Sequence, residues 1–330
     1  MARVVRFHRI GGPEVLQIDT VDLPAPGAGE VRIHVKALGL NRAESMFRSG
    51  QYLEDPHFPS KLGYEAAGTV ESVGPEVVGF KPGDVVSVIP SFPQSKYGVY
   101  GDQTIVPAAA LAKHPTSLSW EEAAAIWMQY TTAYGALIEI AQLKKGDTVL
   151  IPAASSSVGL AAIQITNAVG ATPIALTRKG DKRKALTDLG AAHVIATEEQ
   201  DLVAETLRLT NGKGARIVFD PVGGPTVAKL AAAMTTGGIL FQYGALSTEP
   251  TPLPLMELLG KTLTIRGYVV LVDLIGYPER VERAKKFINE GLASGKLKLV
   301  IAKTFPFNQI VEAHRYLESN QQIGKVVVTV

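Results

Sequence analysis

The feature that most constrains the fold of this chain is a regular alternation of strand-like and helix-like segments over residues 148–270. Short apolar runs are separated by longer segments whose apolar residues recur at helical spacing. The expected strands are TVLIPA, TPIALT, HVIAT, RIVFD, GILFQYGA and LTIRGYVV, and the expected helices are VGLAAIQITNAVG, DKRKALTDLG, DLVAETLRLT, TVAKLAAAM and MELLGKT. Strands and helices in this order form βαβ units, so the sequence predicts a doubly wound parallel sheet.

Residues 1–115 follow a different pattern, rich in turns and short strand-like runs. The run VRIHVKAL alternates apolar and polar residues, and KPGD at 81–84 separates two further runs. A helical segment then begins near residue 120, where Ser119 and Glu122 match a capping box. Residues 277–330 are expected to hold two helices and a final strand, GKVVVTV. The sequence therefore predicts an α/β protein with an additional β-rich domain.

Composition excludes several classes of function. The chain has 33 Lys and Arg against 31 Asp and Glu, a net charge of +2, which gives no reason to expect a nucleic acid or an anionic membrane as partner. It has no cysteine, which rules out disulfides, thiolate zinc sites, iron–sulfur clusters and cysteine nucleophiles. The uncharged stretch 148–177 contains Pro152 and Pro173, so we read it as strand, turn, helix and strand and not as a membrane span. The N-terminus lacks the pattern of a signal peptide, and we expect a cytoplasmic protein.

The first βα turn is a candidate phosphate-binding site. It runs IPAASSSVGLAAIQ from Ile151 to Gln164, follows a strand and opens a helix. A helix N-terminus offers N–H groups and partial positive charge to a pyrophosphate, and small residues allow its close approach. Two glycines of the G-x-G-x-x-G pattern are missing, so an ordinary small-residue turn is the alternative. The expected cofactor contacts here are Ala154, Ser155, Ser156, Ser157, Val158 and Gly159.

The end of the second strand predicts which dinucleotide binds. An NAD-selective site usually has an acidic residue there, whereas Thr177 is followed by Arg178 and Lys182. Basic side chains suit a 2′-phosphate. We therefore expect NADPH in preference to NADH, with these three residues as contacts. The alternative is a solvated charge cluster at a helix start, where Asp181 would be an N-cap.

Several longer motifs carry a family resemblance over nearly the whole chain. They are PGAGEVRIHVKALGLNRAESMFRSGQY, LGYEAAGTVESVGPEVVGFKPGDVV, AASSSVG, FDPVGG and the terminal GKVVV. In these motifs the chain resembles the medium-chain dehydrogenase/reductase superfamily, and within it the zinc-independent NADPH:quinone oxidoreductases. The resemblance implies a GroES-like catalytic domain from residues 1–122 and 266–330, with a Rossmann domain inserted at residues 123–265. It also implies a homodimer formed through the edge strand LTIRGYVV.

The resemblance also implies positions for the site residues. At three positions where zinc-containing relatives have metal ligands, this chain has Asn41, Tyr64 and Gln129, so we expect no metal. The expected catalytic residues are Asn41, Tyr52, Tyr64 and Gln129. Further cofactor contacts are expected from Thr131, Tyr243, Gly244, Ala245, Val269, Val270 and Lys325. The alternatives are a turn residue for Asn41, barrel packing for Tyr52 and a surface lysine for Lys325.

The expected function is the zinc-independent, NADPH-dependent transfer of hydride to a small-molecule quinone or α,β-unsaturated carbonyl (enone). A hydrogen-bond donor near the carbonyl oxygen would stabilise the negative charge that develops there. Two alternatives stay open at this point. One is an enoyl thioester reductase of the same superfamily, and the other is an NADPH-binding protein with little turnover.

Overall fold

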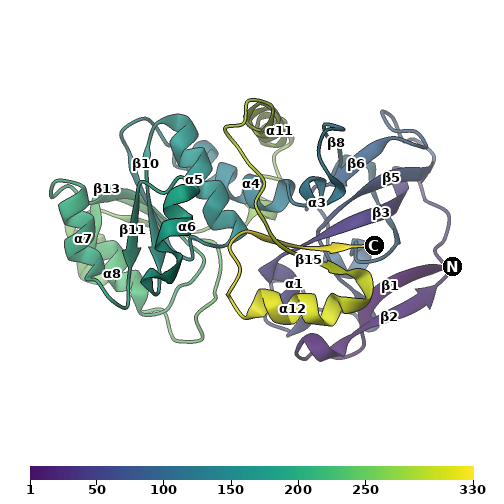
Figure 1. Cartoon of the computed structure of the whole chain (residues 1–330), viewed down its shortest axis with the longest axis horizontal. Helices are drawn as coiled ribbons and strands as arrows, with labels where there is room; N and C mark the ends of the chain where they lie inside the picture. The colour runs from purple at the N-terminus through teal and green to yellow at the C-terminus, as the bar shows by residue number, and fades with distance from the viewer. The chain divides into compact units, whose positions relative to one another are not determined.

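The computed structural model describes residues 1–330 and divides the chain into two compact units. The first unit comprises residues 1–128 and 299–330, and the second comprises residues 129–298. In Figure 1 the first unit combines the purple start of the chain with its yellow end. No helix is long and apolar enough to cross a membrane.

The first unit contains two sheets, as the strand-like pattern of the N-terminal region predicts. A three-stranded sheet has the order β2-β1-β4, and a seven-stranded sheet has the order β15-β16-β3-β5-β6-β8 with β7 paired to β3. The strands are β1 (Ala2–Phe7), β2 (Leu16–Val21), β3 (Glu30–Leu40), β4 (Ser60–Lys61), β5 (Glu65–Val73), β6 (Val85–Val88), β7 (Gln103–Pro107), β8 (Leu111–Lys113), β15 (Ile301–Pro306) and β16 (Lys325–Thr329). The antiparallel pairing of β16 with β3 joins the two ends of the chain.

The helices of the first unit are short. They are α1 (Arg42–Arg48), α2 (Gln94–Tyr97), α3 (Trp120–Ala123) and α12 (Ile310–Glu318). The capping box predicted for Ser119 and Glu122 is confirmed at the start of α3. The expected single helix beyond it is interrupted at residues 124–126 and resumes as α4 (Trp127–Tyr134), which ends in a π-helical turn (Gly135–Ile140). Helix α1 and strand β15 were not among the elements expected from the sequence.

The second unit is the doubly wound parallel sheet that the alternation predicts. Its strand order is β11-β10-β9-β12-β13-β14, and every neighbouring pair is parallel. The strands are β9 (Thr148–Ile151), β10 (Thr172–Thr177), β11 (His193–Ala196), β12 (Ala215–Asp220), β13 (Met234–Gln242) and β14 (Thr264–Gly267). Because the strands are parallel, the turns that follow β9, β10, β12 and β13 lie along the same sheet edge.

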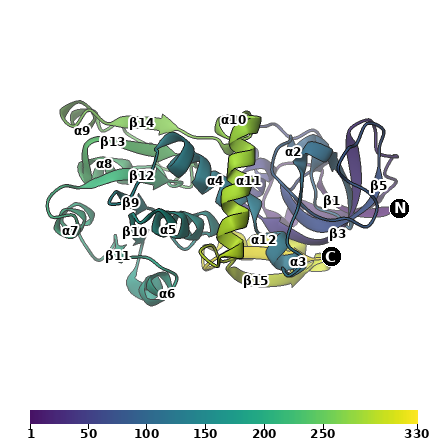
Figure 2. The ribbon, with the colours of Figure 1, turned by 90° about the horizontal axis from the view of Figure 1, so that it is seen from above.

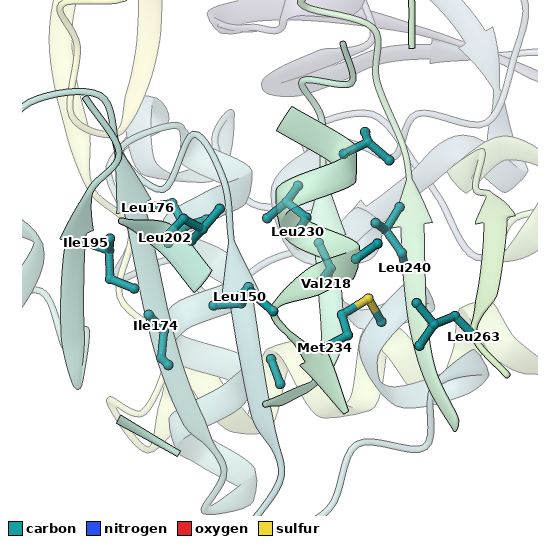
Figure 3. Packing of buried hydrophobic residues seen from close by; sticks show 14 residues of the cluster. Leu150, Ile174, Leu176, Ile195, Leu202, Val218, Leu230, Met234, Leu240 and Leu263 are labelled. Atoms are coloured by element: carbon teal, nitrogen blue, oxygen red, sulfur yellow. The ribbon is translucent and has the colours of Figure 1, made fainter. Parts of the chain in front are cut away.

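Helices cover both faces of this sheet. The helices are α5 (Ser157–Val169), α6 (Arg183–Asp188), α7 (Leu202–Leu209), α8 (Thr226–Ala232), α9 (Leu255–Gly260), α10 (Val270–Asp273) and α11 (Pro278–Ala293). Figure 2 shows α7 and α8 on one face of the sheet and α5 on the other. Leu202 of α7 and Leu230 of α8 pack on Leu150 and Leu240 of the strands (Figure 3). This buried cluster holds α7 and α8 against the strands of the sheet.

The second boundary between the units lies between residues 298 and 299, whereas the sequence predicts it between residues 265 and 266. Residues 266–298 belong to the second unit, because β14 pairs with β13 and α11 packs on the end of α4. In that packing Phe287 lies 5.2 Å from Tyr134, ring centre to ring centre, and Arg283 is paired with Glu139 at 2.7 Å. These contacts are long-range, so the local sequence pattern does not reveal them.

Candidate functional site

The turn after β9 has the geometry of a helix N-terminus prepared for an anion. Ser156 is the N-cap of the 13-residue helix α5, and its Oγ accepts a hydrogen bond from Gly159 N at 3.0 Å. Ala153 adopts a positive φ of 48°, which turns the chain from the strand into the helix. The first N–H groups of a helix lack intrahelical partners, so this turn can present them to a phosphate.

Two glycines keep the sheet edge compact at this point. A Cβ on Gly159 would lie 2.7 Å from Ala154 Cα, and a Cβ on Gly244 would lie 2.7 Å from Pro221 O. Both approaches are closer than a side-chain carbon tolerates. Gly159 therefore has the close-packing role of the last glycine in a dinucleotide fingerprint, although Ser156 and Ala153 replace the first two.

The basic turn after β10 reaches the same place. Lys182 Nζ donates a hydrogen bond to Ser155 Oγ at 3.1 Å, and burial lowers the pKa of this ammonium. Arg178 is exposed, Thr177 is half-buried, and Gly180 N donates to the Glu199 carboxylate at 3.0 Å. The structure thus joins Lys182 to the turn between β9 and α5 and leaves Arg178 at the surface.

The ends of β12 and β13 form a third part of this edge. Tyr243 stacks on Phe219 with ring centres 4.0 Å apart, and Gly244 and Ala245 continue from it. Asp220 is completely buried, accepts backbone hydrogen bonds from Val222 and Gly223, and has a pKa raised by that burial. Sequence reasoning did not single out Asp220, although it ends a strand in the motif FDPVGG.

The remaining expected contacts of this unit lie on α4 and beyond β14. Gln129 and Thr131 are buried on α4, and Tyr268 Oη donates to Thr131 O at 3.5 Å. Val269 is the N-cap of the short helix α10, and Val269 N donates to Asp273 Oδ2 at 2.9 Å. The half-buried Val270 is the first residue of that helix.

In the first unit, Asn41 lies at the centre of a buried polar network. Its Oδ1 accepts a hydrogen bond from Lys325 Nζ at 2.6 Å, and its Nδ2 donates at 3.2 Å to Glu44 Oε1 and to Glu65 Oε2. Lys325 Nζ also donates to Glu65 Oε2. Both the oxygen and the nitrogen of the Asn41 amide are therefore hydrogen-bonded to residues of its own unit.

The two carboxylates of this network have different partners. Glu44 accepts from Asn41 N at 2.8 Å and Tyr64 N at 3.1 Å, and burial raises the pKa of Glu44 to about 7. Glu65 Oε1 accepts from Met128 N at 2.8 Å. Sequence reasoning missed Glu44, yet its spacing from Asn41 is that of a capping box, which the structure places at the start of α1.

Tyr52 and Tyr64 form a second cluster in the same unit. Tyr64 Oη donates to Tyr52 Oη at 3.5 Å, and their rings meet edge to face with centres 6.4 Å apart. Phe47 and Phe92 extend the aromatic cluster on either side. Burial raises the pKa of both tyrosines, so both hydroxyls are protonated at neutral pH.

Comparison with known proteins agrees with these two units. Residues 27–153 match the family described as alcohol dehydrogenase GroES-like domain, and residues 157–290 match the family described as zinc-binding dehydrogenase. Quinone oxidoreductase 1 of Escherichia coli is 34% identical over 98% of both chains. The chain belongs to the quinone oxidoreductase branch of the medium-chain dehydrogenase/reductase superfamily.

Two further comparisons, one with a curated relative and one with a solved structure, agree with this family assignment. A 2-haloacrylate reductase of a Burkholderia species is 29% identical over 99% of this chain and 98% of its own. The crystal structure of the Escherichia coli quinone oxidoreductase complexed with NADPH superposes with a TM-score of 0.90 at 31% identity over the full length of both chains. The branch assignment makes this protein an oxidoreductase, and its GroES-like and Rossmann-like units confirm the predicted fold class.

The zinc implied by one family description does not fit the residues of this oxidoreductase. Zinc in proteins is held by cysteine, histidine and carboxylate ligands, and no group of three such side chains lies together in residues 1–330. Asn41 is bound to Lys325, while the Tyr64 hydroxyl is directed to Tyr52. Glu65 is held by the same lysine and by a backbone N–H group.

Proposed function

We propose that this protein is an NADPH-dependent reductase of quinones or α,β-unsaturated carbonyls that works without zinc. The observation that carries the proposal is the contact of Lys182 with Ser155. This contact brings an ammonium to the candidate phosphate-binding turn between β9 and α5, in a chain that is 34% identical to a quinone oxidoreductase over 98% of both chains. The 2-haloacrylate reductase among its relatives supports an activated alkene as an alternative acceptor to a quinone.

The residues of the second unit, which contains the parallel sheet, fit the phosphates of a dinucleotide. The start of α5 would hold the pyrophosphate through backbone N–H groups and the hydroxyls of Ser155 and Ser157. Lys182, supported by the exposed Arg178, would bind a 2′-phosphate by charge-assisted hydrogen bonds. Gly159 and Gly244 would keep the backbone of the sheet edge close-packed beside the bound dinucleotide. When bound, NADPH supplies the hydride.

The tyrosines of the other unit supply the polar partner for an acceptor. Because the Tyr64 hydroxyl donates to Tyr52, the proton of the Tyr52 hydroxyl is available to a carbonyl oxygen. Its raised pKa keeps Tyr52 protonated at neutral pH, so it serves as a donor throughout the physiological range. A donor aimed at the developing oxyanion stabilises charge that is absent in the ground state. The neighbouring aromatic rings suit a flat acceptor.

A homodimer is part of the proposal. β14 is the last strand of the sheet and pairs only with β13, so its other edge can take a second copy of itself. We expect a mass of twice 35.1 kDa in light scattering after size-exclusion chromatography. A mass of 35.1 kDa at micromolar concentration would contradict this part of the proposal.

Acceptor-dependent oxidation of NADPH tests the catalytic proposal. The purified protein is assayed in a metal chelator with quinones, enones and enoyl thioesters, and the rate is compared with that in added zinc. Saturable turnover of a quinone or enone that is equal in both conditions is the expected result. A preference for enoyl thioesters would favour that alternative, and NADPH binding without turnover of any acceptor would favour a binding protein.

A further inference from the structure

The buried network around Asn41 contains two carboxylates and a single ammonium. Glu44, Glu65 and Lys325 are each no more than 1% exposed. Buried charges are stable only when they are paired and hydrogen-bonded. Four backbone or amide N–H groups help to satisfy the carboxylates. The only cation that a hydrogen bond or ion pair brings to either carboxylate is Lys325, which contacts Glu65.

The fold brings Lys325 to this place through strand register. Lys325 is the first residue of β16, whose next two residues pair with Leu40 and Gly39 of β3. Gly39 leaves room for the lysine, because a Cβ there would lie 2.9 Å from Lys325 Cε. Lys325 N is also anchored, since it donates to Val300 O at 2.8 Å. Lys325 is thus fixed by hydrogen bonds at both its backbone N–H group and its side-chain ammonium.

The ammonium also sets the orientation of the Asn41 amide. Oδ1 faces Lys325, and Nδ2 faces Glu44 and Glu65. A flipped amide would place its NH₂ group against the ammonium and its oxygen against two carboxylates. Lys325 therefore positions Asn41 as well as neutralising the carboxylate charge.

We propose that Lys325 is the resident cation of this site and takes the place of the metal ion that the match to a zinc-binding family would suggest. The site offers oxygen atoms from Glu44, Glu65 and Asn41, the ligand type that hard divalent cations prefer. In the native protein the ammonium occupies Asn41 Oδ1 and Glu65 Oε2, while the Glu44 oxygens accept from N–H groups of Asn41 and Tyr64. Removing the ammonium leaves an anionic, oxygen-lined space, and a divalent cation then becomes its replacement.

Manganese binding to the full-length Lys325→Ala variant tests the inference. Binding is measured by calorimetry and by the rise in Tm with added Mn²⁺, with chelator-treated protein as the starting point. We expect the variant to bind Mn²⁺ at least ~10-fold more tightly than the native protein, with a Tm that Mn²⁺ raises only in the variant. Equal affinity of the two proteins, or a folded variant without any response to Mn²⁺, would overturn the proposal.

Lys261→Ala is the matched control. Lys261 Nζ donates to three backbone carbonyls, those of Ala231, Ala232 and Met234, and to no carboxylate. Loss of this lysine removes comparable hydrogen bonds without leaving a negative charge. We therefore expect a lower Tm and no response to Mn²⁺; a response equal to that of Lys325→Ala would show that the effect is not specific to the network.

A second comparison, in which the charges of both Lys325 and Glu65 are removed, tests the inference if Lys325→Ala does not fold. Lys325→Met is compared with Lys325→Met/Glu65→Gln, in which both charges of the pair are absent. If Lys325 acts as the cation for Glu65, the double variant regains at least about half of the Tm lost by the single variant and ignores Mn²⁺. A double variant no more stable than the single one would contradict the inference. None of these readouts uses turnover, so they are independent of which acceptor the enzyme reduces.

Discussion

Lys325 and Glu65 form a buried ion pair between residues that are 260 positions apart in the chain. Lys325 belongs to the last strand and Glu65 to the start of β5, and both pack against β3 in the same sheet. The pair thus links the C-terminal strand to the N-terminal part of the first unit. Since Glu65 also accepts from Met128 N, it anchors the last residue before the second unit begins.

Glu44 makes the stability of the protein depend on pH. Burial raises its pKa from 4.5 to about 7, so the native state retains a proton that the unfolded state has lost in this window. Its contribution to stability is complete below pH 4.5 and is lost as the pH rises through about 7. Glu44→Gln stays neutral, so its advantage over the native protein in free energy of unfolding should grow by about 2 kcal/mol between pH 4.5 and 7.

Chemical denaturation at several pH values measures this slope. The slope matters and not the offset, because glutamine also loses one of the hydrogen bonds of Glu44. Glu282→Gln is the control, as Glu282 is exposed and paired only with Lys285. A plot of its free energy of unfolding against pH should run parallel to that of the native protein. A parallel curve for Glu44→Gln would show that Glu44 does not titrate in this window.

Ser156 separates helix capping from phosphate binding. Ser156→Ala removes the hydrogen bond to Gly159 N and should lower the free energy of unfolding by about 1 kcal/mol. Ser156→Asp keeps an N-cap acceptor and a favourable charge at the helix N-terminus, so its stability should change by less than about 0.5 kcal/mol. The same carboxylate would repel a pyrophosphate, and NADPH binding by fluorescence titration should weaken at least ~100-fold. Native affinity in Ser156→Asp would place the pyrophosphate elsewhere.

Lys182 is predicted to set the preference between the two dinucleotides. Lys182→Gln keeps a donor for Ser155 and removes the charge, so the Kd of NADPH should rise about 10-fold while that of NADH stays unchanged. Lys184→Gln is the matched control, because Lys184 is exposed and paired with Asp188. Equal weakening of both dinucleotides by Lys182→Gln would assign the lysine to a shared phosphate and not to the 2′-phosphate.

Tyr52 is predicted to stabilise the negative charge that develops on the acceptor. Tyr52→Phe removes the hydroxyl and keeps the ring, so kcat should fall about 10- to 100-fold with an unchanged Kd for NADPH. Tyr277→Phe serves as control, because Tyr277 is 45% exposed and its ring contacts Arg280. If kcat of Tyr52→Phe equals the native value, the proton comes from another group or from water.

Local patterns in the sequence were sufficient for much of the second unit. The expected strand at residues 172–177 coincides with β10, and the expected helix at 158–170 differs from α5 by one residue at each end. Both have strong apolar periodicity, and α5 ends at Gly170 in the left-handed conformation that glycine favours. Helix α1 was missed because it has seven residues and little periodicity, although Asn41 and Glu44 have the spacing of its capping box.

The amino-acid sequence by itself determined the parallel sheet, the small-residue turn at Ser156 and the absence of thiolate chemistry, because each depends on residue types at short spacing. Only the tertiary structure decided that Lys182 reaches Ser155, that residues 266–298 belong with the parallel sheet, and that Lys325 is buried against Asn41 and Glu65. A terminal GKVVV indicates a strand, and a lysine at its start is usually exposed. Strand pairing across the whole chain places it beside two carboxylates, and burial then turns a surface-type residue into an internal cation.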